Sequence, residues 1–122
     1  MRIWLARHGV TDENTAGGIL GRRDPPLSDA GVAQAEVLAA RMRGAGLTAV
    51  WSSPLRRAQR TAELVAEAAG LVPVVLDDLA ESDRGDWEGR LVADLARESP
   101  ELHAAFVAGD PAFRFPGGES LA

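Results

Sequence analysis

The residues best suited to chemistry stand together near the start of the chain, at Arg7, His8 and Gly9. A neutral imidazole nitrogen is a nucleophile near pH 7, because the ordinary pKa of histidine is about 6.5. A neighbouring guanidinium can hold phosphate oxygens in a bidentate fork, and Thr11 and Asn14 add short neutral donors. The cluster suits capture of a small anion that the imidazole attacks. Taken alone, an incidental Arg-His pair on a surface turn explains these residues better.

The elements that position this cluster can be read from the apolar pattern. Arg2–Ala6 is apolar on both faces, which is typical of a buried parallel strand. Residues 8–26 are glycine-rich and polar, and we expect a long functional loop without an element of its own. Ser28 is a natural N-cap, and the spacing after it predicts a helix that ends near Gly44. Leu47–Trp51 predicts a second strand, parallel to a neighbour because a helix joins them.

A second helix should begin with Ser53 as its cap and Pro54 at its first position, and end at Gly70. The remaining predicted elements are a third strand, a charged active-site loop and two short helices, at Val72–Leu76, Glu81–Arg90, Leu91–Glu98 and Glu101–Ala108. This order predicts a three-layer α/β/α fold with a mainly parallel sheet. We expect residues 1–122 to form a single domain.

Ligands of open parallel sheets bind beyond the carboxyl ends of the strands. His8, Ser53 and Glu81 each follow a predicted strand, so the sequence places them at one edge of the sheet. The amino end of the second helix adds free N–H groups and a partial positive charge that favour an anion.

Three arginines crowd the first turns of that helix, at positions 56, 57 and 60. One of them should face the pocket, but the helical spacing does not choose among them.

The composition excludes several classes of function. With 46% hydrophobic and 25% charged residues the chain is an ordinary globular protein, and its net charge of −5 argues against a nucleic-acid partner. Without cysteine it has no disulfide or thiolate metal site, and its two histidines are too far apart for a metal cluster. We expect neither cofactor nor metal. Lacking a signal-peptide core or a membrane-length apolar run, the protein is expected to be cytoplasmic.

Four separated motifs, taken in order, carry a resemblance to a known family. They are Arg7-His8-Gly9 with Thr11 and Asn14, Ser52–Ala58 with Thr61-Ala62, Glu81 followed by Gly85-Asp86-Trp87-Glu88-Gly89, and Pro116–Ser120. Together they resemble the histidine phosphatase (phosphoglycerate mutase-like) superfamily. Four motifs in the right order make a specific signal.

The resemblance implies roles for single residues. His8 would attack the phosphorus of a small-molecule phosphomonoester to give a phosphohistidine, while Glu81 protonates the leaving group as general acid. The residues implied in substrate binding are Arg7, Asn14, Gly21 and Arg57. The family therefore selects Arg57 from the three arginines of the second helix.

Other polar residues are given ordinary structural roles. Thr61 is expected to be a helix-surface hydroxyl, and Trp87 a packing anchor that holds the charged loop down. Asp83, Asp86 and Glu88 are interpreted as solvated loop carboxylates. His103 lies in a helical pattern and is not followed by glycine, so it does not match the family's second active-site histidine.

The family normally carries that second histidine in a His-Gly pair at the end of a further strand. The chain stops at Ala122 before any such strand, so we expect it to be truncated, to match the amino-terminal part of the family's domain and to leave the sheet incomplete at its carboxyl-terminal end.

The segment Glu81–Gly85 lacks the Arg-Tyr-Gly style of the cofactor-dependent phosphoglycerate mutases, which favours a phosphatase. The last two motifs look similar to those of small bacterial phosphatases such as α-ribazole phosphatase. The alternatives are a phosphoglycerate mutase-type phosphoryl transfer, which is an isomerase activity, or a catalytically impaired phosphate-binding fragment. The sequence does not predict the substrate or the oligomeric state.

Overall fold

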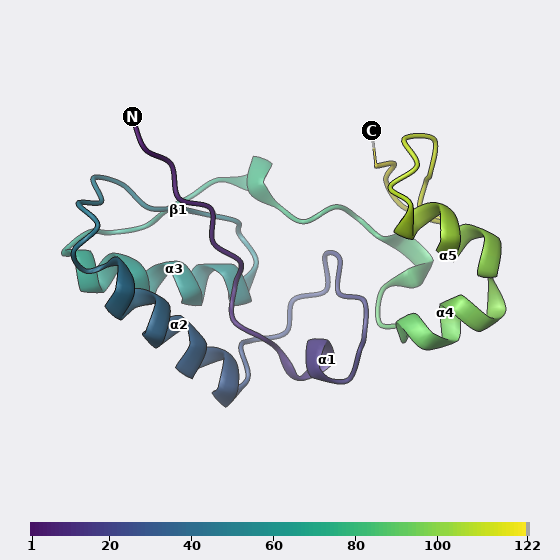
Figure 1. Cartoon of the computed structure of the whole chain (residues 1–122), viewed down its shortest axis with the longest axis horizontal. Coiled ribbons are helices and arrows are strands. Elements are labelled where there is room, and N and C mark those ends of the chain that lie inside the picture. The colour runs from purple at the N-terminus through teal and green to yellow at the C-terminus, as the bar shows by residue number, and fades with distance from the viewer. Residues whose placement is uncertain (122) are drawn as a thin grey trace. The chain divides into compact units, whose positions relative to one another are not determined.

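A computed structural model describes residues 1–121, which form two compact units (Figure 1). The first unit comprises residues 1–12 and 24–80, and the second comprises residues 13–23 and the chain from Glu81 onward. No helix among the described residues is both long enough and apolar enough to cross a bilayer.

The first unit is a β-α-β arrangement with one additional helix. In chain order it contains α2 (Asp29–Met42), β1 (Trp51–Ser52), α3 (Arg56–Ala69), β2 (Val74–Val75) and the 3-10 turn η1 (Asp77–Leu79). The strands β1 and β2 are parallel, with Trp51 opposite Val74 and Ser52 opposite Val75. The predicted α/β class with a parallel sheet is thereby confirmed.

Helix α2 begins where its capping residue predicts. The Ser28 hydroxyl accepts a hydrogen bond from the Gly31 N–H at 3.1 Å, which satisfies one of the free donors of the first turn. The same hydroxyl donates to the Val10 carbonyl oxygen at 3.1 Å. One side chain therefore starts the helix and fastens the segment that follows His8 to it.

Helix α3 starts two residues later than the sequence suggests. The Ser53 hydroxyl accepts the Leu55 N–H at 3.2 Å and so closes a turn before the helix, which begins at Arg56. An Asp24 oxygen accepts the Arg56 N–H at 2.7 Å, a favourable place for a negative charge. The helix ends at Gly70 in the left-handed conformation, as predicted.

Helices α2 and α3 pack against each other through small side chains. Most of the buried apolar side chains of the pair are alanine, which lets the backbones approach closely. They are Ala35, Ala39, Ala62, Val65 and Ala66.

The first predicted strand does not form. Residues 2–6 make no backbone hydrogen bonds to another segment in the described part of the chain, and the side chains of Ile3 and Leu5 are exposed. An extended segment becomes a strand only when a neighbour pairs with its N–H and C=O groups. The prediction of a buried strand over Arg2–Ala6 is therefore wrong for this structure.

The second unit has little regular structure. It includes the 3-10 turn η2 (Gly85–Trp87) and the helices α4 (Val92–Glu98) and α5 (Pro100–Val107), close to the two predicted short helices. The loop expected over residues 8–26 is interrupted by the short helix α1 (Asp12–Thr15). Isolated antiparallel bridges join Gly18 to Leu91 and Arg114 to Ser120.

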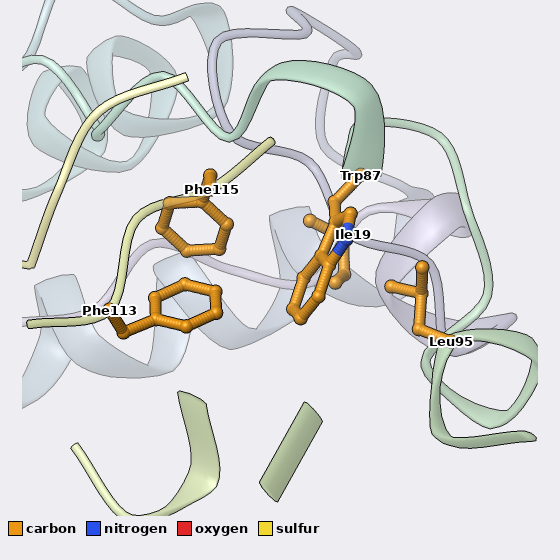
Figure 2. Packing of buried hydrophobic residues seen from close by; sticks show 5 residues of the cluster. All are labelled: Ile19, Trp87, Leu95, Phe113 and Phe115. Atoms are coloured by element: carbon orange, nitrogen blue, oxygen red, sulfur yellow. The ribbon is translucent and has the colours of Figure 1, made fainter. Parts of the chain in front are cut away.

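An aromatic cluster forms the core of the second unit (Figure 2). Trp87 is 3% exposed, and its ring centroid lies 5.4 Å from Phe113 and 5.6 Å from Phe115. Ile19 and Leu95 are buried in the same cluster. Trp87 thus anchors the charged loop by packing, as the sequence predicts.

We expect Trp87→Ala to lower the free energy of unfolding by about 3–5 kcal/mol, the usual range for emptying a buried aromatic site. Trp51→Ala is the matched control, because Trp51 is 60% exposed and should change the value by only about 0.5 kcal/mol. Urea denaturation of the three proteins measures both. Equal midpoints for the two variants would contradict the assignment of the core.

Candidate active site

The hydrogen-bond partners of the two ring nitrogens of His8 select one tautomer. Nδ1 lies 2.6 Å from the Gly9 carbonyl oxygen, and Nε2 lies 3.2 Å from the Nε of Arg57. A carbonyl oxygen can only accept and a guanidinium N–H can only donate. The proton of the neutral ring therefore sits on Nδ1, which leaves the lone pair of Nε2 directed at Arg57.

Arg57 comes from the first turn of α3 and is almost completely buried, with 2% of its surface exposed. Burial of a cation is costly unless hydrogen bonds compensate it, and the contact with His8 is one of them. Arg56 and Arg60 are exposed on the same helix. The structure thus turns inward the arginine that the family resemblance selects.

Thr61 is not a surface hydroxyl, contrary to the expectation from the sequence. It is 6% exposed, and its hydroxyl donates to the Arg57 carbonyl oxygen at 2.9 Å. The Thr61 hydroxyl oxygen in turn accepts the Gly9 N–H at 3.1 Å. One side chain therefore connects the backbone beside His8 to the helix that carries Arg57.

Glycine is required where the segment after His8 crosses the start of α2. A Cβ atom on Gly9 would lie 2.2 Å from the Gly31 carbonyl oxygen, and one on Gly31 would lie 2.0 Å from the Val10 carbonyl oxygen. The two backbones touch directly, so no side chain fits at either position. This contact fixes how closely His8 approaches the helices.

A hollow of about 250 Å³ opens beside His8 in the first unit. The exposed Arg7 borders it together with His8 and the apolar side chains of Leu5 and Leu38. A guanidinium and an imidazole thus share the rim of one open space, which suits a small anion.

The remaining predicted residues, Asn14, Gly21 and Glu81, belong to the second unit. Asn14 is half-buried, and its backbone carbonyl oxygen accepts the Gly17 N–H at 3.0 Å, which closes the turn after α1. Gly21 has a φ of +54°, and a Cβ atom there would lie 2.2 Å from an oxygen of Glu88. Both residues therefore shape the backbone of the loop.

Glu81 accepts hydrogen bonds on one oxygen, Oε1, from the Ser82 N–H at 2.9 Å and the Ser82 hydroxyl at 3.1 Å. Arg84 Nη2 lies 3.5 Å from the same oxygen. Burial raises the pKa of Glu81, but the Ser82 hydrogen bonds and the Arg84 charge together lower it more, so the pKa lies below its ordinary value. The carboxyl group is accordingly ionised at neutral pH.

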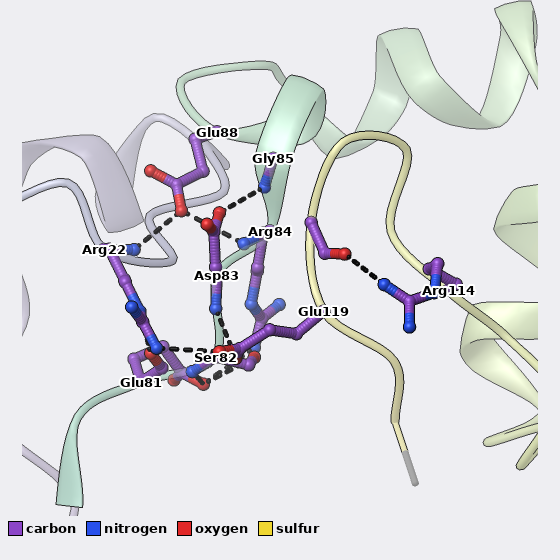
Figure 3. Close-up of polar contacts among 10 residues, drawn as sticks. Arg22, Glu81, Ser82, Asp83, Arg84, Gly85, Glu88, Arg114 and Glu119 are labelled. Atoms are coloured by element: carbon purple, nitrogen blue, oxygen red, sulfur yellow. Dashed lines mark hydrogen bonds and ion pairs between the residues drawn. The ribbon is translucent and has the colours of Figure 1, made fainter. Parts of the chain in front are cut away.

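Glu88 organises the loop rather than solvating it, which corrects the sequence interpretation (Figure 3). Its carboxylate accepts the backbone N–H groups of Arg22 at 2.8 Å, Arg23 at 3.1 Å and Arg84 at 3.1 Å. Three donors from two segments thereby converge on one side chain. No sequence signal marked this residue beyond its place in the Gly-Asp-Trp-Glu-Gly motif.

Glu119 is a second bridge that the sequence did not assign to any role. Its carboxylate accepts the Asp83 N–H at 2.8 Å and pairs with Arg22 at 2.8 Å. The Arg22 side chain also donates to the Glu81 carbonyl oxygen at 3.3 Å. The Pro-Gly-Gly-Glu-Ser motif therefore fixes the backbone on which Glu81 is carried (Figure 3).

Among residues 1–121, no group of three or more histidine, cysteine, aspartate or glutamate side chains is placed to hold a metal ion.

The family profile described as "Histidine phosphatase superfamily (branch 1)" matches residues 3–122. A curated relative, "Probable phosphoglycerate mutase GpmB" of Yersinia pestis, is 38% identical over 121 residues, which cover 99% of this chain and 56% of the relative. The chain thus spans about half the length of the curated relatives it matches.

Solved structures agree with the fold. A mycobacterial glucosyl-3-phosphoglycerate phosphatase in complex with VO3 has a TM-score of 0.83 at 36% identity, over 93% of this chain and 54% of that one. The α-ribazole phosphatase of Shigella flexneri has a TM-score of 0.83 at 35% identity, over 98% of this chain and 59% of that one.

We expect Thr61→Val to lower the free energy of unfolding by about 1–3 kcal/mol, because it leaves the buried Gly9 N–H without its acceptor. Thr48→Val is the matched control, since Thr48 is exposed on a loop of the same unit. Urea denaturation compares the two variants with the wild type. A Thr61→Val midpoint equal to that of the control would argue against the bridge.

Proposed function

The chain belongs to the histidine phosphatase superfamily, branch 1, and on that premise we propose that the protein hydrolyses a small phosphomonoester through a phosphohistidine on His8. The observation that carries the proposal is the contact of His8 Nε2 with the Nε of Arg57 at 3.2 Å. It joins a neutral nucleophile to a buried cation that can bind phosphate. We treat residues 1–122 as one histidine-phosphatase-like domain in this proposal.

The first step transfers the phosphoryl group to the imidazole. The Nε2 lone pair, which accepts an N–H of Arg57 in this structure, must be released before it can attack. Oxygens of an incoming phosphate are stronger acceptors than imidazole and would draw the guanidinium to themselves. Nε2 then forms a bond to phosphorus while the bond to the ester oxygen breaks, and the Gly9 carbonyl stabilises the ring as its charge becomes positive.

The second step hydrolyses the phosphohistidine and regenerates free His8. Glu81 gives a proton to the departing ester oxygen in the first step, and its carboxylate then takes a proton from water as that water attacks phosphorus. The bond between Nε2 and phosphorus breaks, and inorganic phosphate leaves. Catalysis of this kind rests on position and on stabilisation of charge at the phosphoryl oxygens.

The substrate-binding roles of the remaining residues belong to the same proposal. Arg7 on the rim of the hollow and the buried Arg57 supply positive charge for the phosphoryl oxygens. Asn14 is proposed to add an amide donor, and Gly21 to keep the loop backbone clear of a side chain.

The names of two relatives support a substrate class. Two solved relatives carry the names glucosyl-3-phosphoglycerate phosphatase and α-ribazole phosphatase, which supports a small phosphorylated metabolite as the substrate here.

A phosphoglycerate mutase is the second candidate, because the curated relatives bear that name at 38% identity. The two activities differ in the acceptor of the phosphoryl group, which is water for a phosphatase and a second hydroxyl for a mutase. Incubation with 3-phosphoglycerate separates them. Release of inorganic phosphate supports the phosphatase, and formation of 2-phosphoglycerate alone supports the mutase.

We expect His8→Gln to reduce hydrolysis of an aryl phosphate on the order of 10³-fold or more, because it removes the nucleophile. His103→Gln is the matched control, since His103 lies in α5 and is the other histidine of the chain, and its turnover should equal that of the wild type. Acid-labile phosphate bound to the protein after rapid quenching should disappear in His8→Gln alone. Undiminished turnover in that variant would remove the proposed nucleophile.

A further inference from the structure

Arg84 has surroundings that its place in a charged loop does not explain. Its guanidinium carbon lies 5.7 Å from the ring centre of Phe106 and 5.3 Å from that of Phe115. Its Nε is buried and, among the residues that the structure describes, has no hydrogen-bond partner. The side chain is 24% exposed. A cation placed against two aromatic rings is held in position by them.

Burying the Arg84 Nε–H costs free energy that an Arg84 side chain exposed to water would not lose. A buried N–H without an acceptor loses its hydration and gains nothing in return. The five N–H donors of a guanidinium form a rigid fork, so placing one end of the fork fixes the other. The other end of this fork reaches Glu81, where Nη2 lies 3.5 Å from Oε1.

The Glu81 oxygen that faces Arg84 is also the one that accepts both hydrogen bonds from Ser82. Arg22 donates a hydrogen bond to the Glu81 carbonyl oxygen and is itself paired with Glu119. The side chain and the backbone of Glu81 are therefore fixed by separate groups (Figure 3). Of these groups, Arg84 is the one that brings a full positive charge to the carboxylate.

We propose that Arg84 is a positioning residue for Glu81: Phe106 and Phe115 fix the guanidinium, and the guanidinium holds the carboxylate in a single orientation before substrate binds. The inference rests on the proposed function, in which Glu81 handles the proton of the leaving group. Neither the composition nor the spacing of the motifs assigns Arg84 any role.

The charge of Arg84 also affects the source of the proton that Glu81 gives to the leaving group. Because hydrogen bonds and the Arg84 charge outweigh burial, the pKa of Glu81 is low and the free protein carries it ionised. The proton must then enter with the substrate. A phosphomonoester, whose second pKa is about 6, can bind as its monoanion, pass that proton to Glu81, and receive it back on the ester oxygen as the bond to phosphorus breaks.

This route fixes the pH dependence of kcat/KM. The rate constant should fall at low pH as the nucleophile His8 and the free Glu81 become protonated, and fall above about pH 6 as the substrate loses its proton. The charged groups that surround Glu81 are Arg84 and Asp83 from its own loop, Arg22 from the segment before residue 24, and Glu119. Removing Arg84 raises the pKa of Glu81, so the acidic limb moves to higher pH.

The contact itself is tested without any activity, by carbon-13 NMR titration of the Glu81 carboxyl group in the purified protein, with Glu81→Gln used for assignment. Arg84→Met removes the charge and keeps an apolar side chain against the rings. Arg84→Gln is a second neutral variant, which can still be measured if Arg84→Met does not fold. Arg84→Lys restores the charge without the fork. Arg97→Met is the matched control, because Arg97 pairs with Asp94 at the same three-residue spacing.

We expect the pKa of Glu81 to rise in both neutral variants, to lie between these values and the wild-type value in Arg84→Lys, and to stay unchanged in Arg97→Met. The acidic limb of the kcat/KM profile for an aryl phosphate should move in the same order. A displaced carboxylate should also reduce kcat by up to about 100-fold in the neutral variants, with a smaller effect on KM.

The outcomes separate this inference from the proposed function. An unchanged Glu81 pKa in a folded neutral variant overturns the role of Arg84, even when His8→Gln is inactive as proposed. A raised pKa with an unreduced kcat also overturns it, because Glu81 then takes no part in the proton transfer that Arg84 would serve. Full turnover in His8→Gln overturns the proposed function, whatever the NMR titration gives.

Discussion

The first unit depends on one contact, the donation of an Arg57 N–H to the lone pair of His8 Nε2. A guanidinium that is 2% exposed is stable only where acceptors meet it, and the surrounding residues serve this geometry. Thr61 connects the carbonyl of Arg57 to the N–H of Gly9, and Gly9 lies against Gly31 without room for a side chain. His8 and Arg57 are thus positioned by the contacts that Thr61 and Gly31 make with the backbone beside them.

The second unit is stabilised differently, because its charged loop has little regular secondary structure. Backbone N–H groups that would be paired in a helix or sheet are satisfied there by carboxylates, above all by Glu88. Trp87 fastens the same loop to the aromatic core. Acidic residues that look like surface charge in the sequence are therefore structural acceptors. The protein carries a net charge of −5, yet several of its carboxylates are directed at its own backbone.

In both units charged groups are arranged locally in a way that the overall charge does not reveal. In the first unit the exposed Arg7 and the imidazole of His8 border the hollow, within an acidic chain. In the second, Arg84 and Glu81 form a pair whose separation is 3.5 Å and whose geometry is set by aromatic rings. Membership of the histidine phosphatase superfamily gives these local arrangements a common chemical interpretation.

The sequence by itself determined what short-range physics decides. The cap at Ser28 and the end of α3 at Gly70 follow from neighbours within a few residues. The parallel order of β1 and β2 follows from the helix that connects them. The ordered motifs identified the family. The family resemblance then selected Arg57 as the inward-facing arginine among the three in this helix. The packing role of Trp87 was also predicted, because a large apolar residue in a charged loop has few other uses.

Only the tertiary structure decided the roles of Thr61 and Glu88, since the partners that define them are 52 and 66 residues away along the chain. It also decided that residues 2–6 are unpaired in the backbone of the described chain, and that α3 starts at Arg56. A hydroxyl or a carboxylate can form hydrogen bonds equally well with water and with a buried N–H. The neighbouring sequence therefore does not indicate which of these partners it has in the folded protein. Long-range contact settles that choice, because only folding brings the donor within hydrogen-bond distance.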